Sequence, residues 1–93
     1  MERDRALALL ESHHQFPGPF DFRVVVAPAD KELTVSAMVA AAGSGARMEQ
    51  VGERFSSKGN YLALRVRIHV ESAERVLDVY EVLNGLEHVF AAM

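Results

Sequence analysis

The 93-residue chain contains no cysteine and no long apolar run. Without cysteine it cannot form disulfides, use a thiol as a nucleophile or bind zinc through thiolates, and such a composition fits a reducing compartment. Near the start, only five apolar residues, Ala6 to Leu10, precede Glu11. The core of a signal peptide and a membrane-spanning helix both need a longer run. We therefore expect a cytoplasmic protein that does not contact a membrane.

Positive charge is also in short supply. Ten lysines and arginines against thirteen aspartates and glutamates give a net charge of −3. Because a positive field supplies most of the non-specific affinity for nucleic acids, this balance argues against a nucleic-acid partner. Hydrophobic residues make up 49% of the chain and charged residues 25%, which is typical of a globular protein, and the length allows one domain with a single modest core.

The clearest secondary-structure signal is a strict alternation over residues 61–70, which predicts a strand with one buried and one exposed face. The side expected in the core consists of Leu62, Leu64, Val66, Ile68 and Val70. The side expected in water consists of Tyr61, Ala63, Arg65, Arg67 and His69. No other segment offers so regular a buried face, so we expect this strand at the centre of the fold.

Apolar periodicity, prolines and glycines predict the other elements. These are helices over residues 2–13, 30–42 and 72–84, and strands over residues 20–27, 46–55 and 86–93. Asp30 and Ser72 are expected as N-caps, and Gly52 is typical of a β-bulge in the second strand. We expect the apolar faces of the second and third helices to consist of Val35, Met38, Val39 and Ala42, and of Ala73, Val76, Leu77, Tyr80 and Leu83.

After the first helix, the order is strand, helix, strand, strand, helix, strand. Two right-handed crossovers joined by a hairpin give a four-stranded antiparallel sheet in the order 4-1-3-2, with both helices on one face. This is the α+β ferredoxin-like sandwich, βαββαβ. We expect one domain over residues 1–93, with residues 1–15 as an N-terminal helical extension and residues 16–93 as the core. The other sheet face is a candidate partner surface that carries Arg23, Arg65, Arg67 and His69.

The second helix contains an unbroken apolar run from Ala37 to Ala42. A helix that is apolar all round is usually covered on more than one side. Three alternatives follow: alanine tolerates exposure, the first helix docks there through Leu7 and Leu10, or a second subunit does. The last alternative predicts self-association.

Two motifs carry a resemblance to a known family. The first strand opens with Phe16-Pro17-Gly18-Pro19-Phe20, and the third with Ser56-Ser57-Lys58-Gly59-Asn60-Tyr61. In this order of elements they resemble the YbeD-like family of small bacterial proteins, which has no assigned function. The resemblance covers nearly the whole chain and implies the ferredoxin-like fold, kinship with ACT-type regulatory domains that bind amino acids at dimer interfaces, and a link to lipoate metabolism.

ACT-type sites commonly use a glycine just after the first strand, whereas this chain has Ala27-Pro28-Ala29 there. This departure argues against an amino-acid ligand at that loop.

The polar turn before the third strand supports two interpretations. Structurally, Gly59 supplies a positive φ and five polar residues make an adequate hairpin turn. Functionally, two hydroxyls, the Lys58 ammonium and free backbone N–H groups can form an anion-binding nest. We therefore treat the turn as a candidate contact site that consists of Ser56, Ser57, Lys58, Gly59, Asn60 and Tyr61.

No constellation in the sequence indicates catalysis or a metal. Ser56 and Ser57 have no base nearby in the sequence, and His69 and His88 have no carboxylate at a suitable spacing. The adjacent histidines at positions 13 and 14 point about 100° apart on a helix, which does not favour chelation. We expect no catalytic residue, no cofactor and no metal.

The leading hypothesis is therefore a non-enzymatic regulatory or interaction module that binds a small ligand or a protein partner as a homo-oligomer. The alternative is a module that binds single-stranded RNA on its open sheet face. RNA-recognition sheets share this fold and stack bases on aromatic side chains, for which Tyr61 is the candidate here.

Overall fold

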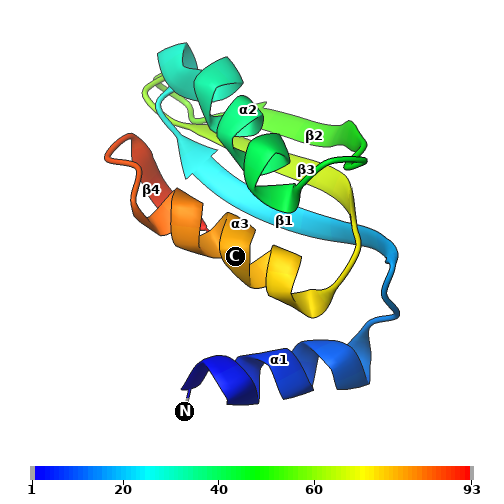
Figure 1. Ribbon diagram of the computed structural model, residues 1–93. Helices are drawn as coiled ribbons and strands as arrows, with labels where there is room; N and C mark the ends of the chain where they lie inside the picture. Colours follow the sequence, from blue (N-terminus) through cyan, green and yellow to red (C-terminus); the bar gives the residue numbers. More distant parts are fainter. Residues whose placement is uncertain (1, 93) are drawn as a thin grey trace.

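A computed structural model describes residues 2–92 (Figure 1), so residues 1 and 93 of the expected domain lie outside the described part. Its α-helices are α1 (Glu2–His13), α2 (Lys31–Ala42) and α3 (Ala73–Asn84), with a short 3-10 helix η1 (Pro28–Asp30) before α2. Its strands are β1 (Gly18–Val26), β2 (Met48–Phe55), β3 (Leu62–Val70) and β4 (Val89–Ala92). Their order confirms the expected α+β ferredoxin-like sandwich with an additional N-terminal helix.

The sheet is antiparallel with the strand order β2-β3-β1-β4, as predicted. β3 pairs with β1 over its full length, from Gly18 opposite Val70 to Val26 opposite Leu62. Its pairing with β2 shifts between Gln50 and Gly52, which confirms a bulge there. α2 and α3 lie across one face of the sheet (Figure 1), so the other face is left without a helix.

The core lies between the sheet and these two helices. All five residues predicted on the inner side of β3 are at most 2% exposed, and Phe22, Val24 and Val26 of β1 join them. The predicted helix faces are only partly right. α2 buries Thr34, Met38 and Ala42, and α3 buries Ala73, Val76, Val79 and Leu83. Val35, Val39 and Tyr80 are half-buried at the edge of the core.

Thr34 was not expected in the core because it is polar, yet its hydroxyl is satisfied there. Oγ1 donates to the Asp30 carbonyl one turn earlier, at 2.8 Å, and accepts from His88 Nε2 at 2.8 Å. Both distances are typical of good hydrogen bonds. Because the Thr34 hydroxyl hydrogen is donated to the Asp30 carbonyl, His88 Nε2 carries the hydrogen of the second bond.

α1 packs beside α3 and not on the alanine run of α2 (Figure 1). Arg3 lies 3.2 Å from Asp78 and 3.5 Å from Glu81, and Leu10 reaches the edge of the core. No residue of α1 is buried. Within the alanine run of α2, Ala42 is buried and Ala40 is exposed, so α3 and the sheet cover only one side of this run.

The Phe16-Pro17-Gly18-Pro19-Phe20 motif forms an elbow that connects α1 to β1. Phe16 and Phe20 pack against the core, and Phe20 lies 4.9 Å from Phe22 between ring centroids. Gly18 is buried, and a Cβ at this position would lie 2.8 Å from the Gln15 carbonyl oxygen. The motif therefore requires glycine because the chain folds tightly back on itself.

Three predicted details differ in the structure. Asp30 and Ser72 precede their helices, but neither side chain accepts a capping hydrogen bond. β2 begins at Met48 and not at residue 46, because the Ala46 N–H closes a turn onto the Gly43 carbonyl. β4 begins only at Val89, whose N–H donates to the Leu86 carbonyl, so residues 86–88 form a turn.

Candidate functional site

The uncovered sheet face arranges its charged side chains in rows across the strands. In one row, Arg67 of β3 lies between Asp21 of β1 and Glu49 of β2. Its Nε and Nη2 donate to the two Asp21 carboxylate oxygens at 2.8 and 3.3 Å, and Nη1 lies 3.5 Å from Glu49 Oε2. We call these three residues the Arg67 row. Its single cation has two carboxylate partners.

This pairing changes how both groups titrate. The hydrogen bond from Arg67 lowers the pKa of the Asp21 carboxyl against the opposing effect of burial, and the charges of Arg67, Arg65 and Arg23 lower it further. The same hydrogen bond raises the pKa of Arg67. Both residues therefore stay charged over the physiological range.

The next row is built differently. Arg65 lies two residues before Arg67 on β3. The register places it opposite Arg23 of β1 on one side and Gly52 of β2 on the other. Among residues 2–92, no carboxylate oxygen lies within 4.0 Å of either guanidinium. Like charges directly opposite each other in an antiparallel pair are destabilising. We call Gly52, Arg65 and Arg23 the Arg65 row.

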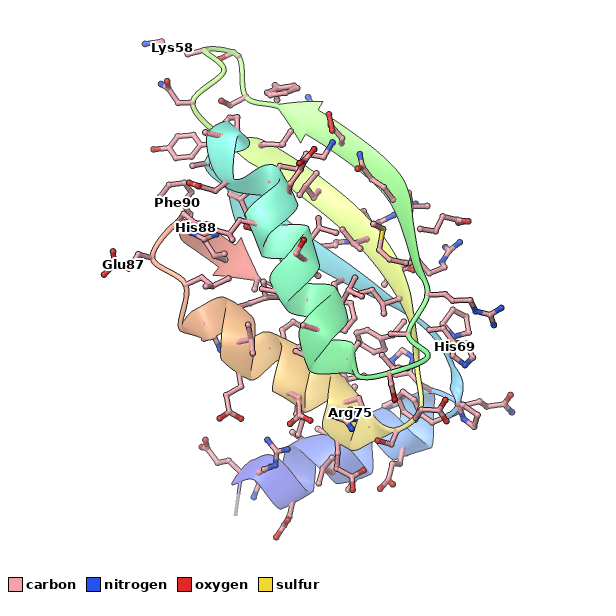
Figure 2. The ribbon with its side chains drawn as sticks, turned by 45° about the horizontal axis from the view of Figure 1, so that its top comes forward. Lys58, His69, Arg75, Glu87, His88 and Phe90 are labelled. Carbon is pink, nitrogen blue, oxygen red and sulfur yellow. The ribbon has the colours of Figure 1, made fainter. Side chains whose placement is uncertain are left out.

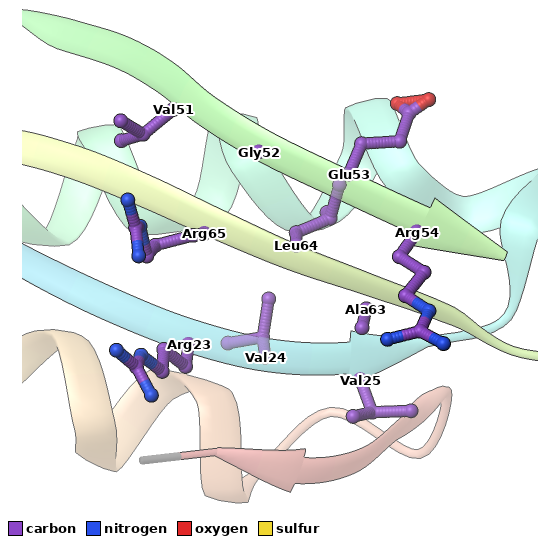
Figure 3. A pocket seen from close by; sticks show the side chains of 10 residues that line it. All are labelled: Arg23, Val24, Val25, Val51, Gly52, Glu53, Arg54, Ala63, Leu64 and Arg65. Carbon is purple, nitrogen blue, oxygen red and sulfur yellow. The ribbon is translucent and has the colours of Figure 1, made fainter.

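A third arginine lies on the same sheet face, in the row that contains Ala63, two residues before Arg65 on β3. Arg54 of β2 lies opposite Ala63 of β3, which lies opposite Val25 of β1. Figure 3 shows Arg23 and Arg65 at one end and Arg54, together with Ala63 and Val25, at the other. Within the described chain, Arg54 also has no ion-pair partner.

These side chains line an open depression of about 550 Å³ on the sheet face, to which Val51 of the bulge also contributes. Apart from the three arginines and Glu53, its lining consists of valine, alanine, leucine and glycine, so the guanidinium groups stand around an apolar surface. Glu53 alternates to the other side of β2, where its carboxylate lies 2.6 Å from Lys31 of α2. That hydrogen bond lowers the pKa of Glu53 and keeps its charge away from the arginines.

An exposed aromatic pair ends the same face. The rings of Tyr61, just before β3, and Phe90 of β4 pack edge to face with centroids 5.1 Å apart. They are 49% and 56% exposed. The sequence predicted Tyr61 here but missed Phe90, because the β1–β4 pairing shifts between Val25 and Val26. Such a shift changes which side of β4 faces outward and leaves no clear signal in a four-residue strand.

A smaller depression of about 240 Å³ connects this aromatic end to the arginines. It is lined by Tyr61, Phe55 and Ser56 together with Val25, Arg54 and Ala63, and the last three also line the larger depression. The sheet face therefore offers one continuous surface that is cationic at one end and aromatic at the other.

The turn that the sequence offered as a contact site is held by its own hydrogen bonds. The Ser56 N–H donates to the Tyr61 carbonyl at 2.9 Å, the Gly59 N–H donates to the Ser56 carbonyl at 2.9 Å, and the Tyr61 N–H donates to Ser56 Oγ at 3.0 Å. Gly59 has a φ of 74°, as the hairpin interpretation expects. Lys58 points away from the tip (Figure 2). An anion site at this turn stays a prediction that rests on Ser57 and Lys58.

The remaining predicted surface residue, His69, lies at the other end of the molecule from Lys58 (Figure 2). It is half-buried opposite Pro19, and its backbone N–H donates to the Arg47 carbonyl at 2.9 Å. The structure thus brings Arg23 and Arg65 together, separates them from His69 by the Arg67 row, and adds Arg54 and Phe90.

Neither a metal centre nor a membrane span is found in the described residues. Between residues 2 and 92, no three histidine, aspartate or glutamate side chains gather as a metal site would require. None of the helices in this range is both long and apolar enough to cross a bilayer. The arginine and aromatic surface is therefore the most distinctive candidate site of this part of the chain.

Comparisons with known proteins identify the family. The search of curated proteins found no match. Among solved structures, the C-terminal domain of the MgtC protein from Mycobacterium tuberculosis is similar, with a TM-score of 0.62 and 14% identity over 87% of this chain and 88% of that one. At this identity the likeness concerns the fold alone. A family model described as "Protein of unknown function (DUF493)" matches residues 11–93. The chain therefore belongs to the DUF493 family, which confirms the YbeD-like resemblance of its two motifs.

Proposed function

We propose that this protein is a non-enzymatic interaction module that recognises a partner through its open sheet face. One observation carries the proposal. In the Arg65 row, Arg23 and Arg65 face each other without a carboxylate, whereas the neighbouring Arg67 row is fully paired. Among residues 2–92, Arg67 has two carboxylate partners and Arg65 has none, so the positive charge of Arg65 stays available for a binding partner. Departures from local stability rules of this kind are expected at functional sites.

The chemistry of the surface also supports binding and not catalysis. Arginine does not give up its proton in proteins, so three arginines supply no general acid or base near neutral pH. His88 is hydrogen-bonded to Thr34 of α2 and lines neither depression. Arginine and aromatic residues are enriched among those that contribute most to binding at protein interfaces.

Self-association, kinship with ACT-type regulation and a link to lipoate metabolism stay predictions of the sequence. Of these, self-association is the simplest to test, because sedimentation velocity over a range of protein concentrations reports it directly. A symmetric contact through Leu33 and Ala40 on the exposed side of α2 would produce a dimer that persists at high salt, since these two side chains are apolar.

The proposal is tested by affinity enrichment from cells that produce the protein, followed by quantitative mass spectrometry. The bait is the wild-type chain, Arg65→Glu on the open face, or Arg5→Glu on α1, which makes the same charge change on the helical side of the molecule. We expect a set of proteins enriched equally by wild type and Arg5→Glu and lost with Arg65→Glu. Equal enrichment by all three baits, or no specific enrichment, would contradict the proposal.

A second candidate, single-stranded RNA binding, gains one observation from the structure. Phe90 joins Tyr61 on the open face, so two exposed aromatic rings, and not one, lie near the arginines. Base stacking on aromatic rings contributes about 1–3 kcal/mol per base. Fluorescence anisotropy with labelled oligouridylate at low salt tests this candidate. No change in anisotropy up to high protein concentration would remove it.

A further inference from the structure

Building on the proposed function, we infer that the open sheet face binds an acidic, extended segment of another protein. Its carboxylates pair with Arg23, Arg65 and Arg54, and an apolar side chain that follows them packs against Tyr61 and Phe90. The inference names the class of partner, which the proposed function leaves open. Three properties of the surface support it.

The first property is charge. Three guanidinium groups without ion-pair partners in the described chain surround one depression. A guanidinium binds a carboxylate through two parallel hydrogen bonds, which gives both strength and a defined geometry. The one carboxylate of β1 that lies near them, Asp21, is already bound by Arg67. A partner that supplies carboxylates therefore removes the Arg23–Arg65 repulsion as it binds.

The second property is spacing. Arg65 and Ala63 lie two residues apart on β3, and Arg54 pairs with Ala63, so the two sources of positive charge are about 7 Å apart along the strands. Tyr61 lies two residues further in the same direction. An extended peptide places alternate side chains on one side at the same interval. Acidic, acidic and apolar residues at alternate positions therefore match the three rows in order.

The third property is shape, which favours a protein segment over other ligands. Small molecules bind in concave sites that enclose most of their surface, whereas this depression is open. A nucleic acid requires a basic track along its backbone, but Arg67 is neutralised by Asp21 and Glu49. The Tyr61 and Phe90 rings pack edge to face at 86°, so they form an apolar corner and not two parallel stacking platforms.

A second copy of this chain fits the surface poorly. A twofold contact centred on the Arg65 row would bring each arginine pair against its own symmetry mate, because isologous interfaces use the same patch on both subunits. Like-charge contacts of this kind oppose association. The occupant we infer is therefore a different protein.

The experiment uses the full chain and a defined probe. The probe is a capped, fluorescently labelled heptapeptide in which two glutamates and then one leucine alternate with serines. The control peptide replaces both glutamates with glutamines. Binding is measured by anisotropy at low and at physiological salt, and the binding surface is located by amide chemical shifts in ¹⁵N-labelled protein. The protein variants are Arg65→Glu, Arg54→Glu and the matched control Arg5→Glu.

We expect saturable binding of the glutamate peptide with a dissociation constant below about 1 mM at low salt, weakening as salt is added. The largest shifts should fall on β1 and β3 around Arg23, Arg65 and Ala63. Arg65→Glu and Arg54→Glu should each reduce the affinity roughly tenfold or more, and Arg5→Glu should not. Circular dichroism of each variant checks that the fold is kept.

Several results would overturn the inference. They are equal binding of the glutamine peptide, no saturation by the glutamate peptide, shifts confined to the helical side, or tighter binding of oligouridylate to the same residues. If the peptide fails while the enrichment experiment still shows proteins lost with Arg65→Glu, the acidic class is wrong and the proposed function stands. If neither depends on Arg65, both are wrong.

Discussion

Arg65 and Arg67 lie on the same strand but have cross-strand neighbours of opposite charge. Arg67 has a carboxylate on each side, whereas Arg65 has an arginine on one side and a glycine on the other. Both face water, so composition and periodicity treat them alike, and only the register separates them. The alternation of side chains along β3 predicted which residues lie on the open sheet face. The cross-strand partners determine which of those residues are free to bind.

Thr34 tests the buried polar pair formed with His88. Replacing Thr34 by valine keeps the shape but removes the hydroxyl that bonds both the Asp30 carbonyl and His88 Nε2. We expect a loss of about 1 kcal/mol in the free energy of unfolding, measured by urea denaturation. His88→Ala should cost less in the Thr34→Val background than in the wild type. Strictly additive losses would show that the two side chains are not coupled.

Asp21 tests the Arg67 row through pH. Its pKa in the folded protein lies below the ordinary value of 3.8, so its charge stabilises the fold above about pH 4 and this stabilisation is lost as the pH falls through the folded-state pKa. Asp21→Asn should lower stability at pH 7 by less than about 1 kcal/mol, because the side chain is 39% exposed and screened. It should also flatten the stability curve below about pH 4.

Chemical denaturation across this pH range measures both effects. Arg67→Gln should flatten the curve in the same way, since it removes the partner that lowers the pKa. A wild-type slope in Asp21→Asn would mean that the ion pair contributes nothing to acid sensitivity.

At the scale of elements, the sequence predicted best where one pattern decides the outcome. The period of two in β3 gave its buried face and its central place correctly. The prediction missed Val79, although Val76, Val79 and Leu83 follow the i, i+3, i+7 spacing of one helix face. It also missed Phe90, which is exposed because the β1–β4 register shifts. Only the register shift leaves no local signal.

Gly18 tests the elbow that begins β1. A Cβ at this position would lie 2.8 Å from the Gln15 carbonyl oxygen, whereas a Cβ at Gly85 would meet nothing closer than 3.5 Å. We expect Gly18→Ala to lower the free energy of unfolding by about 1–3 kcal/mol, because backbone atoms must move. Gly85→Ala, at a helical φ of −87°, should be neutral or slightly stabilising. Urea denaturation in which Gly18→Ala matches the wild type would contradict this account of the motif.

At the scale of the molecule, the sheet and two helices form the core and α1 is attached to its outside. The sequence predicted the helix from its periodicity but not its docking place, because Leu7 and Leu10 fit any apolar surface equally well. The structure places α1 beside α3, where Arg3 finds Asp78 and Glu81. The open sheet face lies on the far side of the core and is unaffected by this contact.

Removal of residues 1–10 tests how much the fold depends on α1. No residue of this helix is buried, and its ion pairs are exposed, so each pair contributes less than about 1 kcal/mol. We expect a folded protein with an unchanged sheet and a stability loss below about 3 kcal/mol, mostly from half-buried leucines. Thermal melting followed by circular dichroism measures it, and loss of the cooperative transition would show that α1 is essential.

The central claim is that Arg65 is retained for binding against the preference of the fold. The most direct measurement is the free energy of unfolding of Arg65→Glu relative to wild type by urea denaturation at low and high salt. The account predicts a gain of about 0.2–1 kcal/mol at low salt, because a like-charge pair directly opposite Arg23 becomes an opposite-charge pair and this outweighs the lost attraction between Arg65 and Asp21 in the next row, and a smaller gain in 1 M salt. A loss of stability at low salt would contradict it, since Arg65 would then stabilise the sheet.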